Sequence, residues 1–299
     1  FLPQGIVLHR SLKRHCPNAV LWVLCMDSAA EDALEVLELP DVRILKLRDL
    51  ETPELLQAKS NRSWGEYCWT LTPHLLYWML EHEGVGRVTY LDADLLFLSS
   101  PMELIDEMVS ASRQILITPH DYGCGYGRPD LFGVFCVQFV TVSNHPEVLG
   151  MLGEWAGQCR DWCYARKDGR GYGDQKYLDE WVNREDLVHV LQSPALAHGP
   201  WRHSILPWSR RGLERHVFHH FHKLRLFQGR RVRLFRGYRI PPVLRGGSYE
   251  VVIRELGAAV DLLESKGLCP VFPPIPVGWR KRLESSLLAL LDLEGWARI

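Results

Sequence analysis

Residues 87–98 have the sequence RVTYLDADLLFL. The first five residues form a short apolar run of the kind found in buried strands, and two carboxylates, Asp92 and Asp94, follow at once. In open α/β sheets, ligands bind beyond the carboxyl ends of the strands. This stretch therefore predicts a strand over 87–91 that carries two acidic side chains to a binding site.

The chain on both sides of this strand alternates two periodicities. Helical patterns cover 29–37, 70–83, 101–108 and 145–163, and short apolar runs cover 19–26, 42–47, 114–118, 134–142 and 187–191. Such alternation is typical of βαβ units. We therefore expect an α/β fold with a mixed, mostly parallel sheet flanked by helices.

Composition narrows the class of protein. The 299 residues are 46% hydrophobic and 24% charged, which predicts a globular chain of one large domain or two smaller ones. Lys plus Arg (35) nearly balance Asp plus Glu (36). Because nucleic-acid binders use an overall positive field to hold phosphates, a nucleic-acid partner is not expected.

Cysteine usage and hydropathy bear on the compartment. The eight cysteines are scattered, and several lie in apolar runs such as 21–25, which predicts reduced thiols in a cytoplasmic protein. Cys159 and Cys163 lack a second Cys/His pair at zinc-site spacing, so structural zinc is disfavoured. No apolar stretch reaches the roughly 20 residues of a membrane span, which predicts a soluble or peripherally attached protein.

Asp92 and Asp94 are chemically suited to a divalent cation, because one carboxylate can coordinate Mg²⁺ or Mn²⁺ while the other positions water or a ligand hydroxyl. The alternative is a solvated loop or a cap of the next helix. The later run VFHHFHK, residues 217–223, favours the metal hypothesis, since it brings imidazoles close to cations. Neutral imidazole can ligate Mn²⁺, and Lys223 or Arg225 can bind phosphate. The alternative for this run is a basic, partly solvated strand.

A third polar segment is Gly173-Asp174-Gln175, which opens a predicted short helix over 174–181. Asp174 has the chemistry of an N-cap, whereas a cap does not explain Gln175. Ahead of the strand at 134–142, residues 122–129 are rich in Gly and aromatic side chains, which predicts a mobile or tightly turned loop of the kind that often carries binding residues.

The chain changes character beyond Pro200. Residues 202–239 are crowded with Arg and His, and two amphipathic helices are expected at about 249–266 and 279–293. We therefore expect a main domain over 1–240 and a C-terminal helical extension over 241–299.

These motifs, in their order along the chain, resemble those of glycosyltransferase family 8 and of related bacterial polysaccharide glycosyltransferases of the lipopolysaccharide or capsule type. The resemblance covers most of residues 1–225. It rests on the Asp-x-Asp of 90–94, the Asp-Gln of 173–175 and the His motif of 220–222, with further subgroup likeness at 66–73 and 162–164.

The resemblance implies a GT-A fold, which is a Rossmann-like fold that binds nucleotide-diphospho-sugars, and a metal-dependent hexosyltransferase-like activity. It implies transfer, with retention, from a nucleotide sugar, usually a UDP-sugar, to a saccharide or lipid-linked acceptor in polysaccharide biosynthesis. Asp92, Asp94 and His220 would hold Mn²⁺ or Mg²⁺, with His222 as the neighbouring alternative.

The resemblance also implies roles around the donor. Asp174 and Gln175 would be catalytic residues beside the sugar, opposite the leaving diphosphate. Donor-binding residues would be Asp92, Lys223 and, in the segment before and within 66–73, Lys59, Arg62, Trp69 and Thr70. Lys59 and Arg62 are candidates for donor contacts because Arg and Lys are the usual phosphate partners. The alternative is that both belong to a solvated face of the protein.

Some positions depart from the family pattern. Gly133 and Phe135 replace its usual Asn and Gly, Lys223 replaces the Gly of the His motif, and 200–202 read Pro-Trp-Arg in place of Pro-Trp-Asn. Residues 1–5 resemble the segment after the first family strand, so a missing first nucleotide-binding strand and a truncated chain are expected. An altered donor preference or a catalytically impaired sugar-nucleotide-binding protein is therefore the first alternative.

Two further hypotheses remain. An Asp-x-Asp phosphohydrolase is disfavoured, because Leu95-Leu96-Phe97 follows the pair and the motif lies in mid-chain. The basic residues of 202–239 suggest peripheral contact with anionic lipid at the cytoplasmic side of the inner membrane, against ordinary surface charge as the alternative.

Overall fold

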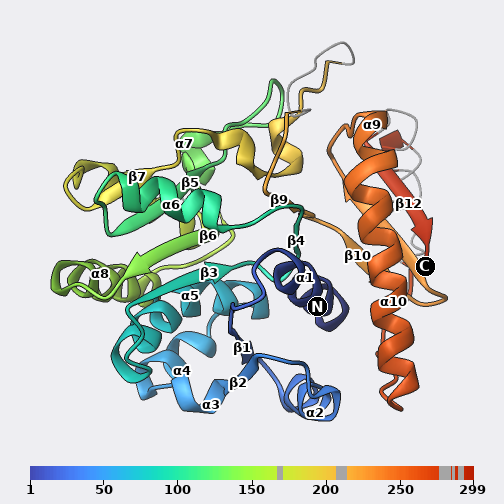
Figure 1. The fold of residues 1–299 in the computed structure, drawn as a ribbon, viewed down its shortest axis with the longest axis horizontal. Coiled ribbons are helices and arrows are strands. Elements are labelled where there is room, and N and C mark those ends of the chain that lie inside the picture. Colours follow the sequence, from blue (N-terminus) through green and yellow to red (C-terminus); the bar gives the residue numbers. More distant parts are fainter. Residues whose placement is uncertain (167–170, 207–213, 276–283, 285–286, 289–292) are drawn as a thin grey trace.

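The computed structural model describes residues 1–166, 171–206, 214–275, 284, 287–288 and 293–299. Figure 1 shows helices around a set of short sheets, with α10 and β12 together at one side. The elements up to β6 are α1 Leu2–His15, β1 Leu21–Cys25, α2 Ser28–Leu37, β2 Val42–Lys46, α3 Leu47–Leu50, α4 Pro53–Lys59, α5 Trp64–His82, β3 Arg87–Leu91, β4 Leu95–Phe97, α6 Met102–Ser110, β5 Ile115–Pro119, α7 Pro129–Phe132 and β6 Phe135–Ser143.

The second half contains shorter elements. They are α8 Pro146–Asp161, η1 Gln175–Asn183, β7 Val188–Val190, η2 Pro194–Leu196, β8 Ala197–His198, η3 Pro200–Arg202, β9 Phe218–His220, β10 Arg225–Phe227, β11 Arg231–Arg236, α9 Pro242–Leu244, η4 Arg245–Tyr249, α10 Glu250–Ser265 and β12 Glu294–Arg298.

The expected mixed α/β class is confirmed. The four-stranded sheet has the order β3-β6-β5-β7. β5 and β7 are parallel, whereas β6 is antiparallel to both β3 and β5. The expectation of mostly parallel strands fails for β6, because only the four-residue helix α7 lies between β5 and β6. Neighbouring parallel strands are usually joined by a crossover that contains a full helix.

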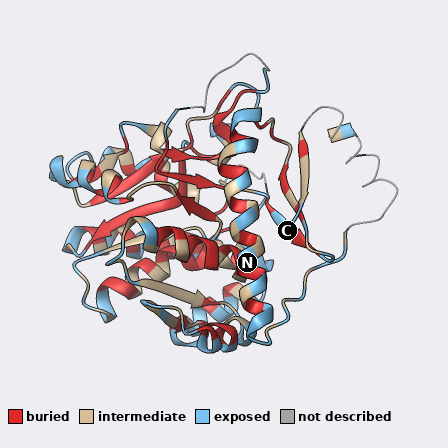
Figure 2. Cartoon of the chain, turned by 45° about the vertical axis from the view of Figure 1, so that its right-hand side comes forward, coloured by how far each residue is buried: buried red, intermediate tan, exposed pale blue. Residues whose placement is uncertain are grey.

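The strand β6 forms the centre of the main core. All nine of its residues are buried, and Figure 2 shows the central strands in the buried colour. Val140 of β6 shares a cluster with Leu76 of α5 and with Leu152 and Trp155 of α8. The rigid, close-packed centre holds the carboxyl end of β3 in place.

Helix α5 is longer than the expected 70–83 because its start is fixed by a capping box. The Ser63 side chain accepts from the backbone N–H of Glu66, and Glu66 in turn accepts from the backbone N–H of Ser63. This arrangement satisfies two otherwise free donors of the first turn. It positions Trp69 and Thr70 near the start of the helix.

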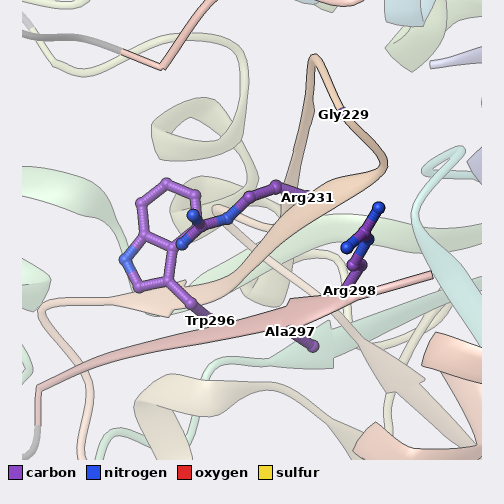
Figure 3. Close-up of a pocket in the computed structure, with 5 residues that line it drawn as sticks. All are labelled: Gly229, Arg231, Trp296, Ala297 and Arg298. Carbon is purple, nitrogen blue, oxygen red and sulfur yellow. The ribbon is translucent and has the colours of Figure 1, made fainter.

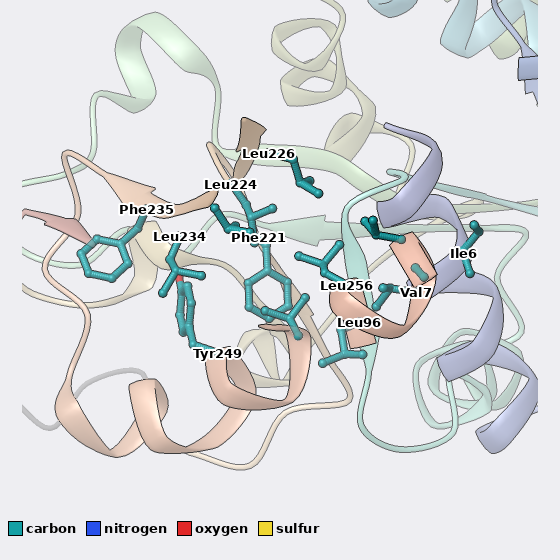
Figure 4. Packing of buried hydrophobic residues seen from close by; sticks show 14 of the residues in the cluster. Ile6, Val7, Leu96, Phe221, Leu224, Leu226, Leu234, Phe235, Tyr249 and Leu256 are labelled. Carbon is teal, nitrogen blue, oxygen red and sulfur yellow. The ribbon is translucent and has the colours of Figure 1, made fainter. Parts of the chain in front are cut away.

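The chain ends are linked through a second core. Figure 4 shows Ile6 and Val7 of α1, Leu96 of β4 and Leu256 of α10 in one buried cluster. The expected boundary between 1–240 and 241–299 stays a prediction.

The expected C-terminal extension is helical over α10, whereas Glu294–Arg298 forms a strand, since the edge of β11 offers backbone partners there. Most of the helix expected over 279–293 lies outside the described residues. None of the helices in the described part of the chain has the length and hydrophobicity needed to cross a bilayer.

Candidate functional site

Three of the residues expected to hold a metal meet in the structure. One ligand atom each from Asp92, Asp94 and His220 lies within 4.8 Å of the others. His220 Nε2 is 3.0 Å from Asp94 Oδ1 and 3.6 Å from Asp92 Oδ2. Two carboxylates and an imidazole form a donor set that fits a divalent cation.

The pairing of β4 with β9 brings this group together. β4 follows Asp94 directly and runs antiparallel to β9, with Leu95 opposite His220. The backbone N–H of Phe221 donates to the carbonyl oxygen of Asp94 at 3.0 Å. The hydrophobic residues Leu95-Leu96-Phe97 thus form the buried strand that anchors the His motif next to the Asp-x-Asp loop.

Gln138 of β6 orients His220, and sequence reasoning missed it. Its Oε1 accepts a hydrogen bond from His220 Nδ1 at 2.8 Å, and its backbone carbonyl accepts from the N–H of Asp92 at 3.1 Å. With Nδ1 protonated, Nε2 faces the carboxylates. The signal in the sequence was an amide inside the otherwise hydrophobic run Phe135-Cys136-Val137-Gln138-Phe139.

The electrostatics of the group are those of charges in a desolvated site. Burial by itself lowers the pKa of His220, but the nearby Asp94 carboxylate raises it well above its usual value. Burial raises the pKa of Asp94, and His220 outweighs this and lowers it. Burial and the charge of Asp94 raise the pKa of Asp92. Two close carboxylates thus require a neighbouring positive charge, which His220 supplies and a divalent cation would supply more strongly.

Asp174 lies near Asp92 and Tyr90. Its side chain is buried at the start of η1, and burial followed by the charge of Asp92 raises its pKa to about 7. Tyr90 donates from its hydroxyl to Asp92 Oδ1 at 3.1 Å, and both carboxylates raise the pKa of Tyr90 further after burial. Asp174 is therefore within electrostatic reach of Asp92, Asp94 and His220, which we call the metal-ligand group. Tyr90, like Gln138, is a residue of the site that the sequence did not reveal.

Other residues expected near the donor are engaged with the protein. Gln175 Nε2 donates to the carbonyl oxygen of Phe132 at 2.7 Å. Thr70 Oγ1 donates to the carbonyl of Glu66 inside α5. Trp69 lies against Gly173, the residue before Asp174, since a Cβ atom added at Gly173 would be 3.2 Å from its ring.

Lys59 and Arg62, the two cations expected to contact the donor, are bonded to other groups of the protein. Lys59 Nζ is 2.7 Å from Glu51 Oε1. Arg62 donates to the carbonyl oxygens of Cys159 and Arg160 in the last turn of α8 and to that of Cys163, two residues beyond the helix. Their role as donor contacts stays a prediction.

The two residues after Phe221 differ in their surroundings. His222 Nδ1 shares a hydrogen bond of 2.8 Å with the Tyr238 hydroxyl, and burial together with the charge of His220 lowers its pKa to about 3. Among the described residues, the ligand-atom group contains His220 and not His222. Lys223 Nζ lies 4.9 Å from the centre of the Tyr238 ring.

Gly133 and residues 200–202, where the sequence departs from the motifs it resembles, have local contacts that account for them. Gly133 has φ 91°, and an added Cβ atom would lie 3.2 Å from Asp179 Oδ1, so glycine suits this position. Trp201 packs against His220 with ring centroids 5.3 Å apart. Arg202 donates to Asp121 Oδ2 at 2.7 Å. Trp201 therefore lies beside the metal-ligand group, whereas Arg202 is paired with Asp121.

Comparison with known proteins gives relatives without an assigned activity. No family model matches the chain. It is 34% identical over 187 residues to the uncharacterized protein YfnD of Bacillus subtilis (strain 168), covering 61% of this chain and 60% of that protein. It is 26% identical over 210 residues to the uncharacterized protein YfnF of the same organism, covering 68% and 69%. The chain thus spans less than two thirds of YfnD.

A solved structure is also similar. The apo form of mouse xyloside xylosyltransferase 1 matches with 18% sequence identity and a TM-score of 0.47, over 74% of this chain and 91% of that chain.

Proposed function

We propose that this chain is a metal-dependent glycosyltransferase of the GT-A type. It transfers a sugar, with retention, from a nucleotide sugar, in the first place a UDP-sugar, to a saccharide or lipid-linked acceptor. The observation that carries the proposal is the meeting of Asp92, Asp94 and His220 at the end of β3, with Asp174 within electrostatic reach. Three separate motifs with this chemistry also occur in the order expected for such enzymes.

A divalent cation bound there, Mn²⁺ or Mg²⁺, would neutralise charge on the leaving diphosphate. The protein residues hold the ligand atoms in place. Gln138 fixes the His220 ring, and Tyr90 fixes the Asp92 carboxylate. Preorganised groups of this kind need no rearrangement when charge develops on the diphosphate, which is the usual source of electrostatic catalysis.

Asp174 and Gln175 are proposed to lie beside the donor sugar. A carboxyl group with a pKa of about 7 can accept or donate a proton near neutral pH, which suits either hydrogen bonding to a sugar hydroxyl or stabilisation of positive charge on the sugar ring. Lys223 supplies a cation near the diphosphate in this proposal. Peripheral contact of the basic residues 202–239 with anionic membrane stays a separate prediction, which co-sedimentation with anionic liposomes at low salt would check.

The test is thermal unfolding with UDP-, GDP-, dTDP- and CMP-sugars, each with Mn²⁺ and with a chelator. A ligand at 100 times its dissociation constant stabilises the folded state by about 2.7 kcal/mol, so the midpoint should rise visibly. A rise with one nucleotide class that disappears with the chelator is the expected result. No rise with any donor, or release of phosphate from a phosphomonoester, would contradict the proposal.

A further inference from the structure

One face of the sheet β10-β11-β12 carries arginines. The strand register places Arg225, Arg233 and Trp296 in one row across the sheet, and Phe227, Arg231 and Arg298 in the next. Residues in such rows project from the same side. The opposite side, which includes Leu226 and Val232, is buried in the core that contains α1 and α10. We call the first side the arginine face.

The arginine face is held together by stacking on aromatic rings. The Arg231 guanidinium lies 5.4 Å from the centre of the Trp296 ring, and that of Arg233 lies 5.5 Å from the centre of Phe227. The rings of Phe227 and Trp296 are 5.3 Å apart. Because the rings hold these guanidinium groups in place, less side-chain freedom is lost when an anion binds.

A pocket opens on this face (Figure 3). It has a volume of about 400 Å³ and is lined by Gly229, Arg231, Trp296, Ala297 and Arg298. This volume falls in the range of small-molecule sites and accommodates a sugar residue. Figure 3 shows the two arginine side chains extending in different directions from neighbouring strands, so they present two separate positive groups to a ligand.

The charge of the pocket has no protein counterpart in the part of the chain that the structure describes. Arg231 and Arg298 are direct cross-strand partners, and like charges at such positions are destabilising. Neither forms an ion pair among the described residues. The adjacent Arg230, by contrast, contacts Asp261 and Glu264 at 2.6 Å each. The pocket thus favours an anionic ligand.

Strand β10 connects the pocket to the metal-ligand group. At its start, Arg225 is close enough to Asp94 to help lower the pKa of that carboxyl group. At its end, Phe227 contacts Trp296. Phe221, whose N–H donates to the Asp94 carbonyl oxygen, lies four residues before β10, so this strand leads from the metal-ligand group toward the pocket.

We propose that this pocket is an acceptor subsite for an acidic saccharide, with the arginines pairing with a carboxylate or phosphate on the sugar and Trp296 forming an apolar wall. Guanidinium groups pair strongly with both oxyanions, and an amphipathic ring such as Trp suits the apolar side of a sugar. This assignment rests on the proposed function, because the acceptor is the remaining substrate of such a transferase.

The test is binding of tetragalacturonate, compared with neutral β-1,4-galactotetraose, followed by calorimetry and by Trp fluorescence. The variant Arg231→Gln/Arg298→Gln should weaken tetragalacturonate binding by roughly ten-fold or more, as expected for loss of about 1.4 kcal/mol or more. Competition by galacturonate and by galactose 6-phosphate separates carboxylate from phosphate recognition. The matched control is Arg43→Gln, because Arg43 also stacks on a tryptophan, 5.2 Å from Trp22, on a different sheet.

Equal affinity for the neutral and acidic tetramers, or unchanged binding by the double variant, would overturn the subsite. Equal binding of polyglutamate would show general attraction of polyanions and also overturn it. The single variant Arg298→Gln serves if the double variant does not fold. Mn²⁺-dependent stabilisation by nucleotide sugars should persist in these variants, so failure of the subsite and failure of the proposed function are distinguished.

Discussion

His219 and His220 are neighbours in β9, yet the two faces of this strand have opposite character. His220 points to Asp92 and Asp94 and is held by Gln138. His219 lies on the other face, where it is fully buried and contacts further buried imidazoles. We call this group the histidine cluster; it consists of His198, His203, His216 and His219.

The pKa shifts express this difference. Burial lowers the pKa of both rings, and Asp94 reverses the direction only for His220. The pKa of His219 is lowered further because a proton on it would be repelled by any proton on His216 or His203. Burial of a histidine therefore does not make a cation site by itself. The carboxylates on the His220 face make the cation site, whereas the histidine cluster forms a neutral part of the core.

The largest expected effect comes from removing a carboxylate on the His220 face. Asp94→Ala should abolish the Mn²⁺-dependent rise in the unfolding midpoint with a nucleotide sugar, because the metal loses a ligand and His220 loses its closest partner. The matched control on the other face is Ser248→Ala, which removes a hydroxyl 3.1 Å from His219 Nδ1. An unchanged rise in the Asp94 variant would show that the metal assignment is wrong.

Gln138→Leu should weaken Mn²⁺ binding by about 10- to 100-fold, the usual effect of losing the partner that orients a ligating histidine. The protein should still fold, because leucine fits a fully buried strand position of similar size. Titration of Mn²⁺ followed by calorimetry measures the change. Gln138→Glu, which keeps an acceptor for His220 Nδ1, should bind Mn²⁺ better than the leucine variant, and the reverse order would count against orientation by Gln138.

The histidine cluster should make the fold sensitive to acid. Burial lowers the pKa values of His198 and His216 below 6.5, so the unfolded chain takes up protons before the folded one does. Stability should fall as pH drops below about 6.5, by up to about 1.4 kcal/mol per pH unit for each such histidine. Urea unfolding at pH 7 and pH 5 measures this loss. His198→Phe should reduce the pH dependence, and an unchanged slope would contradict the assignment.

The smallest expected effect separates His222 from the ligands. Tyr238→Phe removes its hydrogen bond with His222 and should lower the free energy of unfolding by about 1 kcal/mol. Mn²⁺ affinity should stay the same, because the ligand-atom group among the described residues contains His220 instead. A change of ten-fold or more in Mn²⁺ affinity would assign His222 a part in the site.

Local sequence signals predicted much of the fold. The strand expected over 87–91 is β3 with the same limits, and the expected strand over 134–142 differs from β6 by one residue at each end. These elements depend on periodicity within a few residues, which the sequence contains directly. The reversed direction of β6 was not predicted, because periodicity identifies a strand and not its orientation.

The site likewise combines features that the sequence predicted and features that it did not. The sequence by itself determined that two carboxylates follow a strand, that imidazoles lie in a later hydrophobic run and that Asp174 opens a short helix. Only the tertiary structure decided which imidazole meets Asp94, because this depends on the register of β4 against β9. A shift by one residue would turn His219 and not His220 toward the carboxylates, since successive side chains of a strand point to opposite faces. Gln138 and Tyr90 were likewise revealed only when distant strands were brought together.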